Sequence, residues 1–292
     1  MPSVFGITGS EDLGGGLKAN FNLESDINMD GGNLTGASSP STTNKLFGRK
    51  ANIGLSGNFG SLSAGKDIDI IFLQGFIDNV RNSHSSSGFV AHALAANDGL
   101  DTETVFVQNA LKYSTPTWNG LKATIQHKFG EQAGNNSKLK SDAYLVNYAP
   151  VAGLNLAGGL KVIRNTDNEK SELSYIGATY QIGNLRLAAT QHKTDYKTAT
   201  TSTVRTNEYG AAYAVTPALT AAINYVETKN ATGKGDIQSA SVKYALSKRT
   251  SVWALASKKN YDGFNIGAAN YGLAAESGKD STSTSVGVTH SF

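Results

Sequence analysis

The sequence predicts an all-β protein built as an antiparallel barrel, and three observations predict it. First, the 292 residues contain 32 glycines, only 5 prolines and no cysteine, unlike collagenous, proline-rich disordered or disulfide-stapled chains. Second, apolar residues recur at every second position through most of the chain, which is the period of a β-strand. Third, the connections between these strands are alternately short and long, as in an up-and-down meander.

Composition also excludes several classes of protein. The net charge of +3 is too small to indicate the concentrated basic surface of a nucleic-acid-binding protein. Without cysteine there is no thiolate nucleophile and no zinc or iron–sulfur site built on cysteine. Residues 252–256 form about the longest apolar run, far below the roughly 18 to 20 residues that a spanning helix needs. The first six residues lack a secretory signal, so we expect that an export signal was removed or never existed.

The alternation divides each predicted strand into an apolar and a polar register. In residues 17–24, Leu, Ala, Phe and Leu alternate with Lys, Asn, Asn and Glu. Around Trp253 and Leu255 both registers are apolar, so that strand has no predicted orientation. We count about fifteen strands of roughly 8 to 13 residues, long enough to cross a thin apolar layer at a tilt. Further clear examples are residues 121–129, 144–148, 176–180, 185–189, 209–215, 219–225 and 282–292.

The connections predict two rims. Since short and long connections strictly alternate, the turns gather at one rim of the barrel and the loops at the other. Short turns are predicted near residues 12–15, 58–60, 116–119, 150–152, 183, 216–217 and 247–249. Longer loops are predicted near residues 27–45, 68–104, 131–138, 166–169, 197–203, 230–236 and 262–280.

The number of strands decides which way the apolar register points. A barrel of about fifteen strands encloses a space too wide for side chains to fill, so an inward apolar face would line water. Pointed outward, that face meets lipid, and the polar face lines a channel. The alternative is a soluble β-sandwich, which also alternates but turns its apolar face inward.

The two ends of the meander run in the same direction. The strand before residues 12–15 and the final strand, which ends at Phe292, both run toward the turn-bearing rim. As neighbours they would be parallel, whereas an antiparallel barrel closes with an even number of strands. We therefore expect one further upstream strand that this chain lacks, with a parallel closure as the alternative.

The chain resembles Gram-negative general porins of the betaproteobacterial type over nearly its whole length. The resemblance lies in residues 9–19 (GSEDLGGGLKA), 21–24 (FNLE), 46–51 (LFGRKA), 53–55 (IGL), 59–66 (FGSLSAGK), 109–116 (NALKYSTP), 246–250 (LSKRT) and the C-terminal aromatic residue. It implies one transmembrane antiparallel up-and-down β-barrel domain over residues 1–292, with 16 strands in the family. The chain departs from the family in lacking its first strand and in carrying Val4 where members carry an arginine before the Phe-Gly step.

The resemblance also implies a function and partners. Such barrels lie in the outer membrane of Gram-negative bacteria, usually as homotrimers surrounded by lipid, and pass small hydrophilic solutes. Phe292, at the end of the C-terminal strand, is then the signal for the barrel-assembly machinery.

The longest predicted loop, residues 68–104, is too long for a passive connection. By resemblance it is the third loop, folded into the barrel to narrow the pore. A charged wall that faces a loop of different charge creates a transverse field that sorts permeants. Arg49 shares its register with apolar Ala51 and Ile53, so a bulge would have to turn it inward. The candidate constriction residues are Arg49 and Lys66 on the wall, with Asp67, Asp69, Asp78, Arg81, Asp98, Asp101 and Glu103 on the loop.

Basic residues in the polar registers predict the charge of the lumen. A ring of Lys and Arg lowers the barrier for anions, so we expect a mild anion preference. The candidate pore-lining residues are Lys18, Lys112, Lys122, Lys128, Arg186 and Lys243.

Enzyme signatures are missing from the sequence. The five histidines show no metal-ligand spacing, and neither a nucleophile elbow nor a phosphate-binding loop motif occurs. We therefore expect passive diffusion without catalysis, metal or cofactor. The alternatives are a substrate-selective porin with a saturable site in its long loop, a non-conducting surface adhesin or structural barrel, and a soluble lectin-like sandwich.

Overall fold

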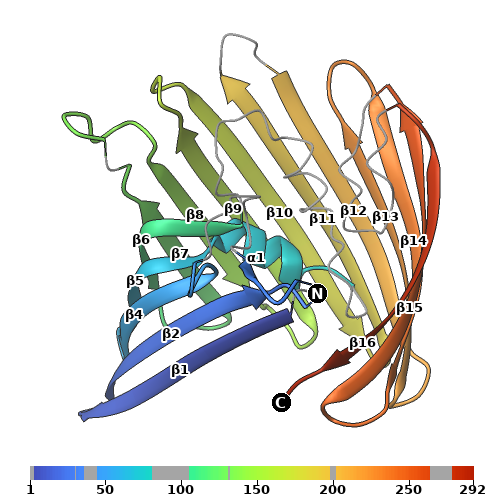
Figure 1. Cartoon of the computed structure of the whole chain (residues 1–292), viewed down its shortest axis with the longest axis horizontal. Coiled ribbons are helices and arrows are strands. Elements are labelled where there is room, and N and C mark those ends of the chain that lie inside the picture. Colours follow the sequence, from blue (N-terminus) through green and yellow to red (C-terminus); the bar gives the residue numbers. More distant parts are fainter. Residues whose placement is uncertain are drawn as a thin grey trace.

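A computed structural model describes residues 3–29, 31–35, 45–80, 105–130, 132–197, 202–263 and 278–292. Sixteen strands form one sheet (Figure 1), and all but β3 follow chain order as antiparallel neighbours from β1 to β16, while β3 pairs with β2. The strands are β1 (Ser3–Gly14), β2 (Leu17–Ile27), β3 (Leu34–Thr35), β4 (Lys50–Gly57), β5 (Gly60–Ile68), β6 (Phe106–Ser114), β7 (Leu121–Lys128), β8 (Ser141–Tyr148), β9 (Leu154–Arg164), β10 (Lys170–Ile182), β11 (Leu185–Lys197), β12 (Ser202–Ala214), β13 (Leu219–Lys229), β14 (Lys234–Ala245), β15 (Thr250–Asp262) and β16 (Ser281–His290).

The connections form the two predicted rims. Between β1 and β2, Gly15 and Gly16 take φ angles of 60° and 80°, which favour glycine because it has no Cβ. The opposite rim carries the long connection between β5 and β6. Strict alternation of connection length is wrong, however. The loop predicted at residues 230–236 is a tight turn over residues 230–233, because β14 already begins at Lys234.

The apolar register faces outward, as predicted. Val286 is 83% exposed and Ile223 is 63% exposed, as expected for side chains that meet lipid. The strand without a predicted orientation, β15, is now assigned, because Ala254 pairs with the outward Val286. Trp253 therefore points inward, and Gly287 lies opposite it because a Cβ there would come within 2.3 Å of the indole.

The sheet path has β1 and β16 as its two ends. They run in the same direction, since every neighbouring pair between them is antiparallel and an odd number of strands lies on the path. The strand pairings recorded for the described residues do not join β1 to β16.

Within the described residues the chain has one α-helix, α1 (Ile70–Ile77), which Figure 1 shows against the curved sheet. No helix in this part of the chain is long and apolar enough to cross a membrane. Ile70 and Ile71 of α1 are buried in a cluster with Ala143, Leu145 and Tyr175 of the neighbouring strands. This cluster packs α1 against the inner side of the sheet.

Candidate functional site

Residues 68–80, which we call the docked segment, begin at the last residue of β5 and lie on the inner side of the curved sheet (Figure 1). The helix α1 within it contacts β7, β8, β9 and β10. Gln126 of β7 binds the docked segment through two hydrogen bonds. Its side chain donates to the Ile68 carbonyl at 3.1 Å and accepts from the Ile70 N–H at 3.2 Å. Gln126 belongs to the polar register of β7, so the docked segment lies on the inner side of the sheet.

The start of α1 has a local cause in the sequence. Asp69 is the N-cap residue, and its carboxylate accepts from the backbone N–H groups of Ile71 and Phe72, both at 2.9 Å. A run of apolar residues follows it, which favours burial over an extended loop. The expectation of a loop throughout residues 68–104 is therefore wrong for this segment, and Asp69 before an apolar run is the sequence signal for the helix.

The docked segment is also held by a buried ion pair. Lys161 Nζ of β9 lies 2.9 Å from Asp69 Oδ2. Lys161 is not among the residues predicted from the sequence, where it is flanked by apolar Leu160 and Val162. The two-residue period could have found it, since Lys161 shares the inward register with Ala157 and Gly159 of the same strand.

Three glycines in the wall allow the docked segment to pack closely against the strands. A Cβ on Gly159 would lie 2.3 Å from Ile71 Cδ1, and one on Gly210 would lie 2.2 Å from Val80 Cγ2. A Cβ on Gly177 would meet both the Tyr175 hydroxyl at 2.2 Å and Asp78 Oδ2 at 2.6 Å. Part of the glycine excess therefore serves close packing against the wall rather than turns.

Asp78 ends the helix and binds the wall. Its Oδ2 accepts from Gln74 Nε2 at 2.8 Å and from the Tyr175 hydroxyl at 2.5 Å. Burial raises the pKa of the Asp78 carboxyl above its ordinary value, and the hydrogen bonds and the charge of Arg186 offset this only in part. Arg186 also donates to the Ile77 carbonyl at 2.9 Å, so this pore-lining candidate holds the docked segment in place.

The next residue extends the contact to β12 and β13. Asn79 Nδ2 donates to Glu208 Oε1 at 2.6 Å, and Asn224 donates to the same oxygen at 2.7 Å. Together these contacts attach both ends of α1 to strands from β7 to β13.

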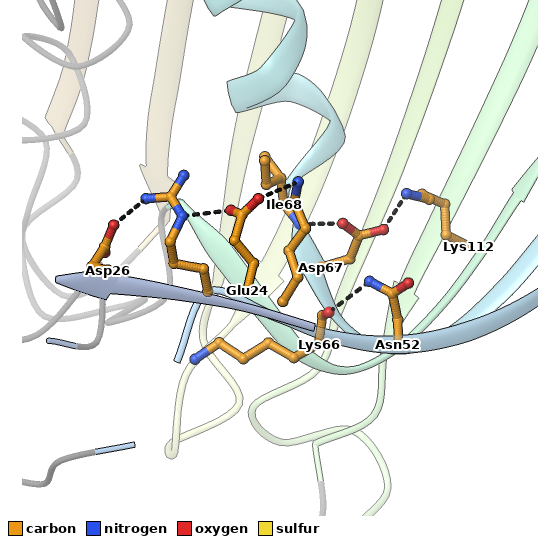
Figure 2. A network of polar contacts seen from close by, with 9 residues as sticks. Glu24, Asp26, Asn52, Lys66, Asp67, Ile68 and Lys112 are labelled. Atoms are coloured by element: carbon orange, nitrogen blue, oxygen red, sulfur yellow. Dashed lines mark hydrogen bonds and ion pairs between the residues drawn. The ribbon is translucent and has the colours of Figure 1, made fainter. Parts of the chain in front are cut away.

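Arg49 is the centre of a second polar network (Figure 2). Its Nε lies 2.6 Å from Glu24 and its Nη1 2.7 Å from Asp26, two inward residues of β2. The register conflict is resolved without a bulge, because Arg49 precedes the first residue of β4 and is free of that strand's alternation. Its guanidinium also stacks over Phe106 at 4.8 Å. Arg49 thus faces inward, with its charge neutralised by two carboxylates.

Asp67 and Lys66 take opposite sides of β5. Asp67 forms an ion pair with Lys112 of β6. Lys66 is the register partner of Ala51 in the outward register of β4, and Figure 2 shows its side chain extending away from the Asp67–Lys112 pair. A register shift between Gly65 and Asp67 accompanies this change of side.

A polar cavity of about 680 Å³ lies beside the docked segment. Leu73 of α1 forms one side of it, and the strands from β1 to β6 form the other. Polar side chains on that wall include Asn20, Asn22, Lys50, Asn52, Asp67 and Lys112. We call this space the inner cavity.

The remaining candidates are spread around the wall. Lys18 and Lys122 are exposed, and Lys128 and Lys243 are half-buried, all in the polar registers. The described residues hold no group of three or more His, Cys, Asp or Glu side chains that could bind a metal ion. The loop candidates Arg81, Asp98, Asp101 and Glu103 lie outside the described residues.

An antiparallel sheet that turns apolar side chains outward, lines its inner side with charge and holds a helix against that lining defines a membrane pore protein. The family model for Gram-negative porins matches residues 1–265, and the chain belongs to that family. It is therefore an outer-membrane β-barrel porin of the Gram-negative type, and its fold is that of a channel.

Individual relatives agree with this assignment. Outer membrane porin protein 32 of Delftia acidovorans is 28% identical over 313 residues, which cover 99% of this chain and 84% of that protein. The structure of an anion-selective porin from Comamonas acidovorans superposes with a TM-score of 0.83 at 24% identity, covering 100% of this chain and 90% of that one. Salmonella typhi OmpF in complex with daunomycin gives a TM-score of 0.72 at 19% identity, covering 98% and 89%.

Proposed function

We propose that this porin is a general diffusion channel for small hydrophilic solutes, with a mild preference for anions and without catalysis or cofactor. The observation that carries the anion preference is that inward acidic residues are paired with cations, whereas several inward lysines are not paired with acids. Four inward acidic residues are each engaged by Lys or Arg, namely Glu24, Asp26, Asp67 and Asp69. Three inward lysines form no ion pair with any described residue, namely Lys18, Lys122 and Lys243.

Unpaired lysines in a lumen lower the energy of a passing anion more than paired ones do. The Comamonas acidovorans structure, whose fold is the same, is described as an anion-selective porin, which supports the proposal for this chain.

We place the constriction at the inner cavity. We assign residues 68–104 to the loop that narrows the pore, and the docked segment attaches this loop to the wall. Lys50, Asp67 and Lys112 then form the charged wall opposite Leu73. Arg49 stays in the set through its ion pairs with Glu24 and Asp26 next to this wall. Asp69 and Asp78 anchor the segment rather than line the passage, and the outward register of Lys66 removes it from the proposed set. Arg81, Asp98, Asp101 and Glu103 stay in the set as predictions from the sequence.

Reversal potentials in a salt gradient across planar bilayers test the selectivity. The wild type is expected to favour anions, and Lys122→Glu is expected to shift the potential toward cations. Lys248→Glu, at an exposed position of the β14–β15 turn, is the matched control for a charge reversal outside the lumen. Clear cation preference of the wild type would refute the proposal. Conductance that saturates at a low solute concentration would instead indicate a substrate-selective porin. The absence of conductance would indicate a closed adhesin or structural barrel.

The assembly is proposed from the family. We propose a homotrimer, inserted by the barrel-assembly machinery through the C-terminal strand and Phe292. The Phe292 ring is exposed and lies 4.6 Å from that of His290, so it stands beyond the end of β16 in reach of another protein. Cross-linking of the protein in native membranes tests the trimer, and removal of Phe292 is expected to lower the amount assembled there.

A further inference from the structure

The inward side chains that line the inner cavity are mainly neutral hydrogen-bonding groups. They belong to β1, β2, β4 and β5 and form two rows across the sheet, in which each residue is the register partner of the next. The first row is Thr8, Asn22 and Asn52, and the second row is Ser10, Asn20, Gly54 and Ser63. Because Gly54 has no side chain, the cavity reaches the backbone between Asn20 and Ser63.

The charged groups of the inner cavity are already paired. Asp67 forms an ion pair with Lys112, and Lys50 Nζ lies 3.4 Å from Glu24 Oε2. A bound ion would have to compete with these partners for the lysines or the carboxylate, whereas a neutral solute would not. The inner cavity therefore favours recognition by hydrogen bonds over recognition by charge.

The asparagines of the inner cavity can both accept and donate. Asn20 Nδ2 donates to Ser56 Oγ at 2.9 Å, and Asn52 Nδ2 donates to the Lys66 carbonyl at 3.0 Å (Figure 2), so their side-chain oxygens remain as acceptors. Asn22 forms no side-chain hydrogen bond within the described part of the chain. An asparagine side chain carries one acceptor oxygen and two donor hydrogens. These side chains therefore suit a solute with several neighbouring hydroxyl groups.

The opposite side of the inner cavity is apolar. Leu73 of α1 faces the cavity and is 37% exposed, so covering this side chain with apolar atoms is favourable. The cavity of about 680 Å³ lies within the range of about 300 to 1,000 Å³ that is usual for small-molecule sites. A matching ligand has hydroxyl groups on one side and a C–H surface on the other.

We propose that the inner cavity is a weak binding site for a neutral pyranose sugar on its way through the pore. The C–H face of the sugar ring lies on Leu73, and neighbouring hydroxyl groups hydrogen-bond to Asn22 and Asn52, which are direct register partners. This inference rests on the channel function proposed above and adds a class of solute that the channel retains. Because the site is open to water, we expect a dissociation constant above about 1 mM, which keeps release fast.

Current noise of channels in planar bilayers tests this proposal with glucose as the probe. In the wild type, glucose is expected to add noise to the ion current, and this noise should saturate with glucose concentration. Triethylene glycol, a neutral ether of similar size without neighbouring hydroxyl groups, is expected to add no saturating noise. Saturation-transfer NMR of the detergent-solubilised protein measures glucose binding independently of conductance.

Variants of the two sides of the inner cavity locate the site. Asn22→Leu keeps the branched shape of the side chain but removes its hydrogen-bonding atoms, so glucose is expected to bind about 5- to 10-fold more weakly. Leu73→Asn removes the apolar contact and is expected to weaken binding about threefold. Asn147→Leu is the matched control, because Asn147 lies in the inward register of β8 but does not line the inner cavity. It is expected to bind glucose like the wild type. Far-UV circular dichroism and heat-dependent gel migration verify that each variant is folded.

Three outcomes would overturn the proposal. Equal noise from glucose and triethylene glycol would reduce the effect to solute size, and an equal loss in Asn22→Leu and Asn147→Leu would place it outside the inner cavity. Gluconate that binds more tightly than glucose would show that the site recognises negative charge.

The two measurements separate this inference from the proposed function. A protein that conducts ions but binds no glucose contradicts the sugar site alone. A protein that binds glucose in the NMR experiment but does not conduct contradicts the channel and supports the site.

Discussion

Lys161 Nζ on β9 lies 2.9 Å from Asp69 Oδ2 at the start of α1, and the two side chains are 5% and 1% exposed. A buried charge that loses its partner destabilises a structure by about 3 to 5 kcal/mol. Removal of one partner of this pair therefore destabilises the docked segment more than the loss of a neutral hydrogen bond, which contributes about 1 kcal/mol.

The first prediction concerns this ion pair. Lys161→Met leaves the Asp69 carboxylate buried without a cation, so we expect the docked segment to detach for part of the time. Single-channel recordings should then show added conductance levels and open-channel noise. Adding Asp69→Asn should quieten the channel again, because asparagine keeps the helix cap but carries no charge.

Lys122→Met is the control, because it removes a lysine of the lumen that does not bind the docked segment. It is expected to change ion selectivity and to leave the noise unchanged. A Lys161→Met channel as quiet as the wild type would show that the ion pair does not hold the docked segment.

The second prediction concerns the glycines of the wall. Gly159→Ala places a methyl group 2.3 Å from Ile71 Cδ1, whereas a Cβ on the neighbouring Gly158 meets nothing within 4 Å. We expect Gly159→Ala to destabilise the barrel by about 1 to 3 kcal/mol through overpacking and Gly158→Ala to have little effect. Unfolding midpoints in urea compare the two variants.

A shorter side chain at position 71 should restore the stability that Gly159→Ala loses. Ile71→Val removes Cδ1, so the combination with Gly159→Ala should be more stable than Gly159→Ala alone. Equal stability of the two alanine variants would contradict the role that we give to Gly159.

The third prediction concerns the network around Arg49. Arg49→Gln leaves Glu24 and Asp26 with only the Lys50 contact to Glu24 at 3.4 Å. We expect cation permeability to rise, since two inward carboxylates lose their counter-charge. Loss of the charged hydrogen bonds should also lower the stability by about 1.5 to 3 kcal/mol. Reversal potentials and urea midpoints measure the two effects, with the exposed Arg249→Gln as control. An unchanged reversal potential would place this network outside the ion path.

The fourth prediction concerns pH. The docked form binds the Asp78 proton more tightly than an undocked form, because burial raises the pKa of this carboxyl. Protonation of Asp78 therefore supports docking below the ordinary pKa of aspartate, and this support is lost as the pH rises through the raised value. Channel noise should increase over that rise and should depend less on pH in Asp78→Asn.

Asp167→Asn, in the exposed turn between β9 and β10, is the matched control and should keep the wild-type pH dependence. Noise that decreases as the pH rises would show that ionised Asp78 is the form that favours docking.

Particular residues show where prediction from the sequence reached its limit. The glycines at residues 14–16 were assigned to a turn, and they take positive φ angles there. Gly159 gave no comparable signal, because its purpose depends on Ile71, which approaches from 88 positions away in the chain. The resemblance to the family puts Lys66 on the pore wall, but Lys66 is the register partner of the outward Ala51, next to a register shift in β5 that the resemblance does not reveal.

The sequence by itself determined that the apolar register of each strand faces lipid, that the polar register faces the lumen and that the ends of the meander run in parallel. Alternation along single strands separates the two faces, and the number of strands sets which face points outward and how the two ends run. Both are read directly along the chain. Only the tertiary structure decided which of these charges are paired with one another. Arg49 is paired with Glu24 and Asp26 of β2, and Lys161 is paired with Asp69. These charges are far apart in the sequence, so they meet only when the sheet curves and α1 docks on its inner side.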